Sequence, residues 1–417
     1  MNDRLTRLFA TVTVFLFSLN AAAYSVSGIS SGAFMAAQMG VIYSDDVTAV
    51  GLVAGGFFNC AGNQYQTASK QALKLGAGYK IFFATEVDVA AQAQGHLSEA
   101  IKISPQNPIY QSVQICMKHP DQAVIDQTSL TDFESKKLIA SLTNIQNQKI
   151  LLYQGQLDKV VNPKMLAKNL EFYKGQNVKD ENIKIIENEK GAHTFATDYK
   201  GLNDCSTQGV PYISSCDLDL AGDILKHALG TPDLVRNSID DEKLIHGINQ
   251  KTSETTPDSI GTYGYLGASP FCLENPSQCQ VHVALHGCEM ADAFDQKLDE
   301  KYVKYLKLGF LQMYKKSERP PWRFYLPVIE DLEPGMGALA FARDAGYMDY
   351  VNDQNKLMIL FPQTWITEKN YPGNPKGCWD WYGWTGDGYQ TNVGLETQWL
   401  NQWIKTVSQD PKKYILQ

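Results

Sequence analysis

The sequence lacks several patterns that mark other classes of protein. No run of basic residues occurs in its 417 residues, and the net charge is −8. Because phosphates require clustered Lys and Arg, we expect no nucleic-acid partner. There is no C-x-x-C motif and no histidine pair at zinc-ligand spacing, so we expect no metal site. The absence of internal repeats and of low-complexity linkers indicates one domain over residues 24–417.

Long hydrophobic runs are also scarce, and the one apolar segment of note lies at the start. Two separate arginines, Arg4 and Arg7, precede the apolar residues 8–19, and three alanines at 21–23 offer a small-residue cleavage site. The apolar run has about a dozen residues, fewer than the roughly 20 that span a bilayer. We therefore expect residues 1–23 to be a signal peptide, and we expect a secreted protein, extracellular or periplasmic, without stable membrane insertion.

Eight cysteines are present, and an even number in an exported chain favours disulfides. Eight cysteines allow about 105 pairings, so the sequence alone does not decide among them. Two pairs are close in sequence within Gly-, Pro- and Ser-containing stretches, which is typical of local loop disulfides, and four cysteines then remain for longer bridges. The expected pairs are Cys205–Cys216, Cys272–Cys279, Cys60–Cys116 and Cys288–Cys378.

Short apolar runs typical of buried strands alternate with segments of helical periodicity. The predicted strands cover residues 24–27, 47–54, 81–84, 149–153, 183–186, 281–285 and 356–361. The predicted helices cover residues 133–147, 163–174, 218–229 and 396–407, and residues 205–270 are otherwise rich in loops. Strands that alternate with helices predict an α/β fold, with a mostly parallel central sheet and helices on both faces.

The clearest chemical motif is Gly28-Ile29-Ser30-Ser31-Gly32, which has the G-x-S-x-G pattern of a nucleophile elbow. Small residues on both sides of Ser30 leave room for a tight turn. The following run, 34–39, suits a helix whose N-terminus faces developing negative charge. Alone the pattern is short, and a simple Gly/Ser turn is the alternative. The strand–turn–helix context favours Ser30 as a nucleophile.

Two further residues fit a catalytic triad. Asp158 follows a predicted strand on a Gly-containing loop, where a carboxylate can orient a histidine. His193 lies in a Gly-Ala-His-Thr-Phe segment after the next strand, and the order Ser, Asp, His is that of α/β-hydrolases. The alternative for both is an ordinary loop residue. Asp88 and Asp126 are weaker candidates, and His282 alternates within a strand and is expected to be structural.

The order of the elements points to a rearranged chain. In α/β-hydrolases one oxyanion N–H comes from the residue after the nucleophile, here Ser31, and the other from an early loop that usually carries His-Gly. No such loop precedes the elbow, but His286-Gly287 lies far downstream. A predicted strand at 356–361 and a terminal helix follow it, and such elements normally precede an elbow. The sequence therefore predicts a circularly permuted α/β-hydrolase, which is plausible because domain termini often lie close together.

Seven segments carry a more specific resemblance, and they cover residues 28–45, 54–60, 211–216, 283–288, 341–347, 361–363 and 377–381. In this order they resemble secreted poly(3-hydroxybutyrate) depolymerases of the circularly permuted type. Two departures are segment 289–340, which looks like an insertion after the oxyanion loop, and residues 64–145, which match poorly. We expect no separate polymer-binding domain.

The resemblance implies the roles of five residues. Ser30, Asp158 and His193 form the triad, and the backbone N–H groups of Ser31 and Cys288 form the oxyanion hole. The reaction implied is ester hydrolysis through an acyl-enzyme, which needs no cofactor. The substrate implied is a polyester or a small ester, and no protein partner is expected.

The Trp-rich segment near residue 380 would line the crevice that binds the polyester. Trp379 and Trp381 could offer apolar surface to it, and core packing beside Cys378 is the alternative. Two other functions remain open at this stage. One is a small-ester or lipid esterase in which segment 289–340 acts as a lid, and the other is a secreted binding protein that keeps the fold without the chemistry.

Overall fold

A computed structural model of the chain describes residues 23–62, 108–237, 244–291, 336–367, 374 and 376–416. Several sequence-based predictions fall outside these residues. They are nearly all of the expected signal peptide, the expected strand at 81–84, the candidate Asp88 and most of the expected insertion at 289–340.

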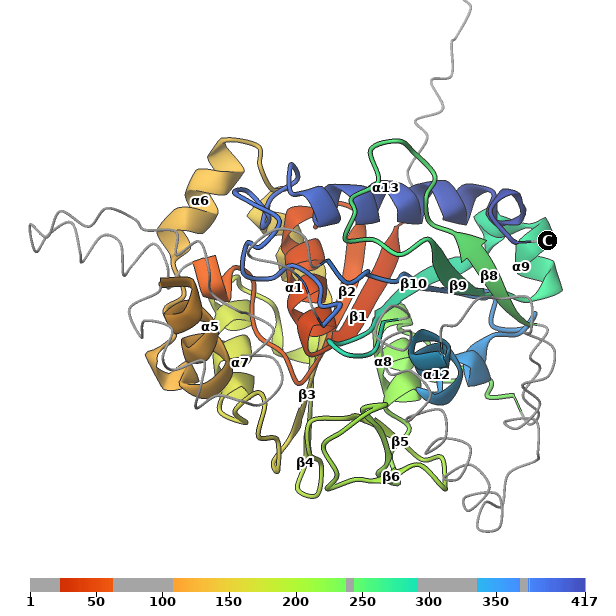
Figure 1. Ribbon diagram of the computed structural model, residues 1–417, viewed down its shortest axis with the longest axis horizontal. Helices are drawn as coiled ribbons and strands as arrows, with labels where there is room; N and C mark the ends of the chain where they lie inside the picture. Colours follow the sequence, from red (N-terminus) through yellow and green to blue (C-terminus); the bar gives the residue numbers. More distant parts are fainter. Residues whose placement is uncertain are drawn as a thin grey trace, which may run out of the picture.

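A mixed sheet of eight strands forms the centre of the molecule, in the order β4-β3-β2-β1-β10-β11-β9-β8. Neighbours from β4 to β11 run parallel, and β9 and β8 add an antiparallel edge (Figure 1). The strands are β1 (Tyr24–Ile29), β2 (Val47–Val53), β3 (Lys149–Gly155), β4 (Ile183–Asn188), β8 (Ile245–Asn249), β9 (Tyr263–Gly267), β10 (Gln280–Leu285) and β11 (Leu357–Phe361). The predicted α/β class with a mostly parallel sheet is confirmed.

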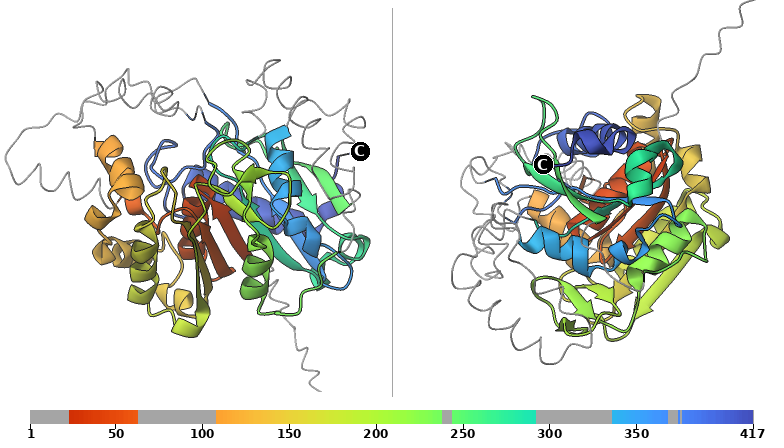
Figure 2. Two further views of the ribbon diagram at one scale, coloured as in Figure 1. Left: turned by 90° about the horizontal axis from the view of Figure 1, so that it is seen from below. Right: turned by 90° about the vertical axis from the view of Figure 1, so that its right-hand side faces the viewer.

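Helices cover both faces of this sheet, as the views in Figure 2 show, and each face has its own apolar core. One core includes residues of α1 (Ser31–Ile42), α5 (Pro108–Lys118), α6 (Gln127–Ser135), α7 (Met165–Gly175), α9 (Pro270–Glu274) and α13 (Leu395–Gln409). The other includes α8 (Leu220–Leu229) and α12 (Met336–Asp344). A small second sheet pairs β5 (Phe195–Thr197), β7 (Ile213–Ser215) and β6 (Asn203–Asp204).

The helix after the elbow is the most deeply buried of these. All twelve residues of α1 are buried, because it packs between the parallel sheet and α13. Its sequence is apolar on every side, which is what a helix enclosed by protein requires. Strand β1 is buried along its whole length, so the elbow is carried by two elements of the molecular centre.

The helix predicted over 133–147 is wrong. Helix α6 covers Gln127–Ser135 instead, and the side chain of Asp126 caps it by accepting hydrogen bonds from the N–H groups of Thr128 and Ser129. The left-handed conformation of Lys137 (φ 57°) then prevents continuation, and a short 3-10 helix follows at Leu142–Asn147. Asp126 therefore has a structural role as a helix cap.

Strands β8 and β9 were not predicted, because their segments carry no continuous apolar run. They are short, partly exposed and mutually antiparallel, and glycine and polar residues interrupt them. By contrast, His282 is confirmed as structural. Its ring is fully buried, and its two nitrogens lie 2.8 Å from Ser25 Oγ and 2.7 Å from Ser27 Oγ on the neighbouring strand.

All four expected disulfides are formed. Two close local loops, and Cys60–Cys116 and Cys288–Cys378 join segments 56 and 90 residues apart. In the part of the chain that the structure describes, no helix has both the length and the apolar character to cross a membrane.

Candidate active site

Ser30 stands on a sharp turn between the central strand β1 and helix α1. Its backbone has φ 56° and ψ −121°, a conformation that a residue with a side chain rarely adopts. The turn is held on both sides. The Ser30 N–H donates to the carbonyl of Val53 on β2 (2.9 Å), and its carbonyl accepts from the N–H groups of Ala33 and Phe34 in α1. Such a strained strand-to-helix turn is the geometry of a nucleophile elbow.

The two glycines of the motif are required because other backbone atoms lie too close to them to leave room for a side chain. A β-carbon at Gly28 would lie 2.3 Å from the carbonyl oxygen of Gly32, across the turn. A β-carbon at Gly32 would lie 2.4 Å from the carbonyl oxygen of His286 and 2.5 Å from that of Leu285. The elbow therefore packs directly against the end of β10, and the second glycine sets the distance between them.

We expect Gly32→Ala to lower both stability and esterase activity. The added methyl group meets two backbone carbonyl groups, which cannot move aside without shifting β10 or α1. Overpacking of this kind costs about 1–3 kcal/mol or more in free energy of unfolding. Urea unfolding and hydrolysis of p-nitrophenyl butyrate measure the two effects.

A matched control is Gly175→Ala at the end of α7, where a β-carbon has no neighbour within 4 Å. This variant should unfold at nearly the wild-type urea concentration and keep full activity. Equal behaviour of the two variants would contradict the close approach at Gly32.

Asp158 and His193 are brought together by the ends of two neighbouring parallel strands. Asp158 lies in the loop after β3 and His193 in the loop after β4. Backbone hydrogen bonds join these loops, from Gln156 N–H to the Asn188 carbonyl (2.9 Å) and from Leu157 N–H to the Gly191 carbonyl (2.8 Å). The result is a contact of 2.8 Å between His193 Nδ1 and Asp158 Oδ2. Strand β1 ends at the same edge of the sheet, so Ser30 shares this edge.

The surroundings of the Asp158 carboxylate determine how it orients the imidazole. Its Oδ1 accepts hydrogen bonds from the backbone N–H groups of Val160 (2.7 Å) and Val161 (2.9 Å), and its Oδ2 accepts from Gln154 Nε2. A carboxylate that accepts on both oxygens leaves His193 Nδ1 as the donor. The Nε2 atom is then the basic nitrogen. Both side chains are almost completely buried, so water does not compete for their contact.

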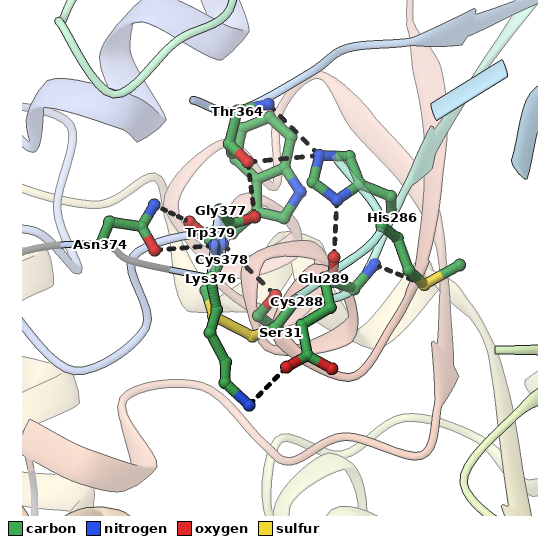
Figure 3. Close-up of a disulfide and its surroundings, with 12 residues drawn as sticks. Ser31, His286, Cys288, Glu289, Thr364, Asn374, Lys376, Gly377, Cys378 and Trp379 are labelled. Carbon is green, nitrogen blue, oxygen red and sulfur yellow. Dashed lines mark hydrogen bonds and ion pairs between the residues drawn. A yellow bond between two sulfur atoms is a disulfide. The ribbon is translucent and has the colours of Figure 1, made fainter. Parts of the chain in front are cut away.

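The downstream His-Gly segment lies beside the elbow in space. Strand β10 pairs with β1 in parallel, so residues 286–288 leave the sheet next to Ser30. A β-carbon at Gly287 would lie 3.2 Å from Ser30 Cβ. Figure 3 shows the next residue, Cys288, joined by its disulfide to Cys378. The structure thus brings together the elbow and the loop that sequence analysis paired across more than 250 residues.

A polar bridge that sequence analysis missed connects this loop to the His193 side of the site. Glu289 has a left-handed backbone (φ 63°), and its carboxylate lies 2.5 Å from Lys376 Nζ and accepts from the Tyr212 hydroxyl (2.5 Å). The Tyr212 ring in turn meets the His193 ring edge-on, with centroids 6.2 Å apart. Sequence spacing does not relate these residues to one another, because they come from three separate loops, although Tyr212 lies in the resemblance segment 211–216.

The two tryptophans occupy different environments. Trp379 is fully buried and its ring lies against that of His286, with centroids 5.5 Å apart, which favours core packing for this residue. Trp381 is 6% exposed and stacks on Phe34 of α1 at a centroid distance of 4.1 Å. Only Trp381 keeps some exposed surface, and it lies directly over the helix that starts at the elbow.

The loop that carries Trp381 is built around two buried carboxyl groups. The Asp380 carboxylate accepts hydrogen bonds from four backbone N–H groups of residues 382–385 and from the Thr385 hydroxyl. These donors favour the ionised form, but desolvation by burial outweighs them and raises the pKa of Asp380 above its ordinary value. Glu396 of α13 accepts from the Asp380 N–H (2.7 Å), and burial together with the Asp380 charge raises the pKa of Glu396 to about 8. Glu396 therefore carries a proton at neutral pH.

This proton makes stability depend on pH. Between the ordinary pKa of 4.5 and about 8, the unfolded chain releases the Glu396 proton and the folded chain retains it. Glu396 therefore makes its full contribution to the free energy of unfolding below pH 4.5. This contribution is lost as the pH rises toward 8. We expect Glu396→Gln to remove this pH dependence. At pH 8 its free energy of unfolding should exceed that of the wild type by a few kcal/mol, the amount to which the pKa shift corresponds. Urea unfolding at pH 5 and pH 8 measures it.

The control for this measurement is Glu171→Gln on the exposed side of α7, where the carboxylate is largely solvated. This variant should keep the wild-type slope. A Glu396→Gln protein with an unchanged pH slope would show that Glu396 is ionised in the folded state.

A central, mostly parallel sheet with a sharp strand–turn–helix at its edge is the architecture of α/β-hydrolases, and the chain is similar to named members of that class. The chain is 28% identical over 390 residues to polyhydroxybutyrate depolymerase from Talaromyces funiculosus, covering 91% of this chain and 88% of that protein. It is 26% identical over 386 residues to poly(3-hydroxybutyrate) depolymerase from Delftia acidovorans, covering 92% of this chain and 59% of that protein. No protein-family model matches the chain.

Two solved structures have the same fold. A crystal structure of PHB depolymerase from Penicillium funiculosum superimposes with a TM-score of 0.63 and 25% identity, covering 94% of this chain and 97% of that one. A PHB depolymerase with a serine-to-alanine substitution, complexed with an R3HB trimer, superimposes with a TM-score of 0.62 at the same identity and coverage. The expected resemblance to poly(3-hydroxybutyrate) depolymerases is thereby confirmed, in sequence over about nine tenths of the chain and in fold.

Proposed function

We propose that this protein is a serine esterase that hydrolyses poly(3-hydroxybutyrate) and its oligomers through an acyl-enzyme. The observation that carries the proposal is the 2.8 Å contact between Asp158 and His193 Nδ1, at the sheet edge where the strained turn presents Ser30. In this arrangement His193 has a basic Nε2 atom at the same edge of the sheet as Ser30. The relatives named as depolymerases, one of them complexed with a hydroxybutyrate trimer, support the choice of ester.

In the proposed mechanism His193 Nε2 accepts the Ser30 proton while Oγ attacks the ester carbonyl. Asp158 holds the imidazole in its tautomer and stabilises the imidazolium. The N–H groups of Ser31 and Cys288 bind the tetrahedral oxyanion. His193 then protonates the departing alkoxide. Water repeats the sequence on the acyl-enzyme and releases the hydroxy acid, so no cofactor enters the reaction.

Two features support these oxyanion donors. Ser31 is the first residue of α1, and the first N–H groups of a helix have no partner within the helix and carry partial positive charge. Cys288 directly follows Gly287, the glycine that approaches Ser30 Cβ. The disulfide to Cys378 anchors this loop. Trp381, stacked above α1, is the aromatic residue proposed to contact the polyester.

We also propose that the chain is a circularly permuted hydrolase. Strands β10 and β11 follow the elbow strand by more than 250 residues, yet β10 pairs directly with β1 in the sheet and β11 pairs with β10. The oxyanion loop after β10 therefore enters the site from the C-terminal half of the sequence. Export with removal of residues 1–23 is proposed as well, and four disulfides support an oxidising compartment. Sequencing the N-terminus of the exported protein would test cleavage before Tyr24.

The substrate is tested with purified protein in two assays. We expect it to clear a suspension of poly(3-hydroxybutyrate) and to hydrolyse p-nitrophenyl butyrate. Cleavage of the soluble ester alone would reject the polymer substrate and favour the small-ester alternative with segment 289–340 as a lid. Binding to the polymer with neither reaction would favour the non-catalytic binding protein and reject the proposed function.

A further inference from the structure

We propose that His286 is a positioning residue that holds the oxyanion hole in its active orientation. The proposal rests on the function proposed above for the Cys288 N–H. His286 lies at the end of β10, immediately before Gly287, and its side chain is fully buried. In the sequence this residue is marked only by the His-Gly pattern, which assigns no role to its imidazole.

The imidazole acts on the peptide unit that contains the oxyanion donor. His286 Nδ1 lies 2.7 Å from the carbonyl oxygen of Gly287. This carbonyl and the Cys288 N–H belong to the same peptide unit, which is planar and trans, so they point in opposite directions. A hydrogen bond that fixes the Gly287 carbonyl therefore also fixes the direction of the Cys288 N–H.

The tautomer of His286 follows from its two backbone partners. A carbonyl oxygen can only accept, so Nδ1 carries the hydrogen. Nε2 accepts from the backbone N–H of Thr364 (3.2 Å), which can only donate. Figure 3 shows the His286 ring beside Thr364, with dashed lines from its Nε2 to the backbone nitrogen and the hydroxyl oxygen of Thr364. Burial lowers the pKa of His286 to about 4, so the neutral ring persists through the neutral pH range.

The hydrogen bond from His286 is needed because Gly287, the residue before Cys288, leaves this peptide unit free to rotate. A β-carbon at Gly287 would lie 3.2 Å from both Ser30 Cβ and the Ile29 carbonyl oxygen, so close approach to the elbow requires glycine. Glycine also allows the following peptide to rotate at little cost. A rotated peptide would present the Gly287 carbonyl oxygen to the oxyanion, where two negative groups repel. The disulfide restrains the Cys288 side chain but not this rotation.

The test compares two substitutions at position 286. His286→Leu removes the donor to Gly287, and we expect kcat for p-nitrophenyl butyrate to fall about 10- to 100-fold, approaching the loss of a full oxyanion donor. KM should change less than about threefold, because the ground-state ester depends little on the hole. His286→Asn places an amide N–H near the position of Nδ1, and it should recover most of the lost kcat.

His282→Leu is the matched control, since His282 is an equally buried histidine four residues earlier, in β10, and its partners are serine side chains. It should lose stability without a comparable loss of kcat. The proposal is overturned if folded His286→Leu protein keeps wild-type kcat, or if His282→Leu loses as much at equal stability.

A crystal structure of His286→Leu separates this proposal from the proposed function. We expect the Gly287–Cys288 peptide to be rotated or to occupy two orientations. A peptide in the wild-type orientation would refute the positioning role even if the enzyme is active. A wild-type protein without esterase activity would refute the proposed function, whatever that peptide does.

Discussion

Ser30→Ala is expected to lower kcat for p-nitrophenyl butyrate by about 10⁴- to 10⁶-fold, the range seen when a triad nucleophile is removed. The alanine has no atom that can form the acyl-enzyme, so only the oxyanion donors and substrate binding remain. The fold should be unchanged, because the bonds that hold the turn involve the backbone of residue 30 and not its hydroxyl group. Ester hydrolysis and circular dichroism on the same preparation measure both results.

A suitable control is Ser135→Ala on α6, an exposed serine whose hydroxyl group bonds to the carbonyl of Asp132 within its own helix. It should retain wild-type activity. If Ser30→Ala protein with its four disulfides intact still hydrolyses the ester, Ser30 is not the nucleophile and the proposed triad is wrong.

Asp158→Asn should have the next largest effect, a fall in kcat of about 10⁴-fold. The amide oxygen must remain at the Oδ1 position, because the N–H groups of Val160 and Val161 point at it. The amide NH₂ then faces His193 Nδ1, which must accept instead of donate. The ring hydrogen moves to Nε2, the atom that has to take the proton from Ser30. Steady-state kinetics and a thermal unfolding curve would show lost activity with a retained fold.

Asp126→Asn is the comparison for this variant. Asparagine is as good a helix cap as aspartate, so this change should leave both stability and activity almost unaltered. Comparable losses of activity at the two positions would mean that Asp158 does not act through the tautomer of His193.

Much of this architecture was predictable because local patterns reflect local physics. Buried parallel strands must be apolar along their length, so most central strands were recognised, and the G-x-S-x-G pattern marked the turn that only small neighbours permit. The antiparallel edge was missed for the same reason, since partly exposed strands need no apolar run. The helix predicted over 133–147 was misplaced because the capping role of Asp126 went unrecognised and a left-handed residue ends the helix early.

The sequence by itself determined the candidate triad and the place of the elbow in the chain, and it favoured one set of disulfide pairs, which the structure confirmed. Only the tertiary structure decided which side chains meet. It brought Asp158 to His193 through backbone hydrogen bonds between two loops. It also buried Trp379 and placed the imidazole of His286 against the Gly287–Cys288 peptide unit. These contacts join residues that no repeating pattern in the sequence relates to one another. They arise because parallel strands end at one edge of a sheet, where loops distant in sequence must pack together.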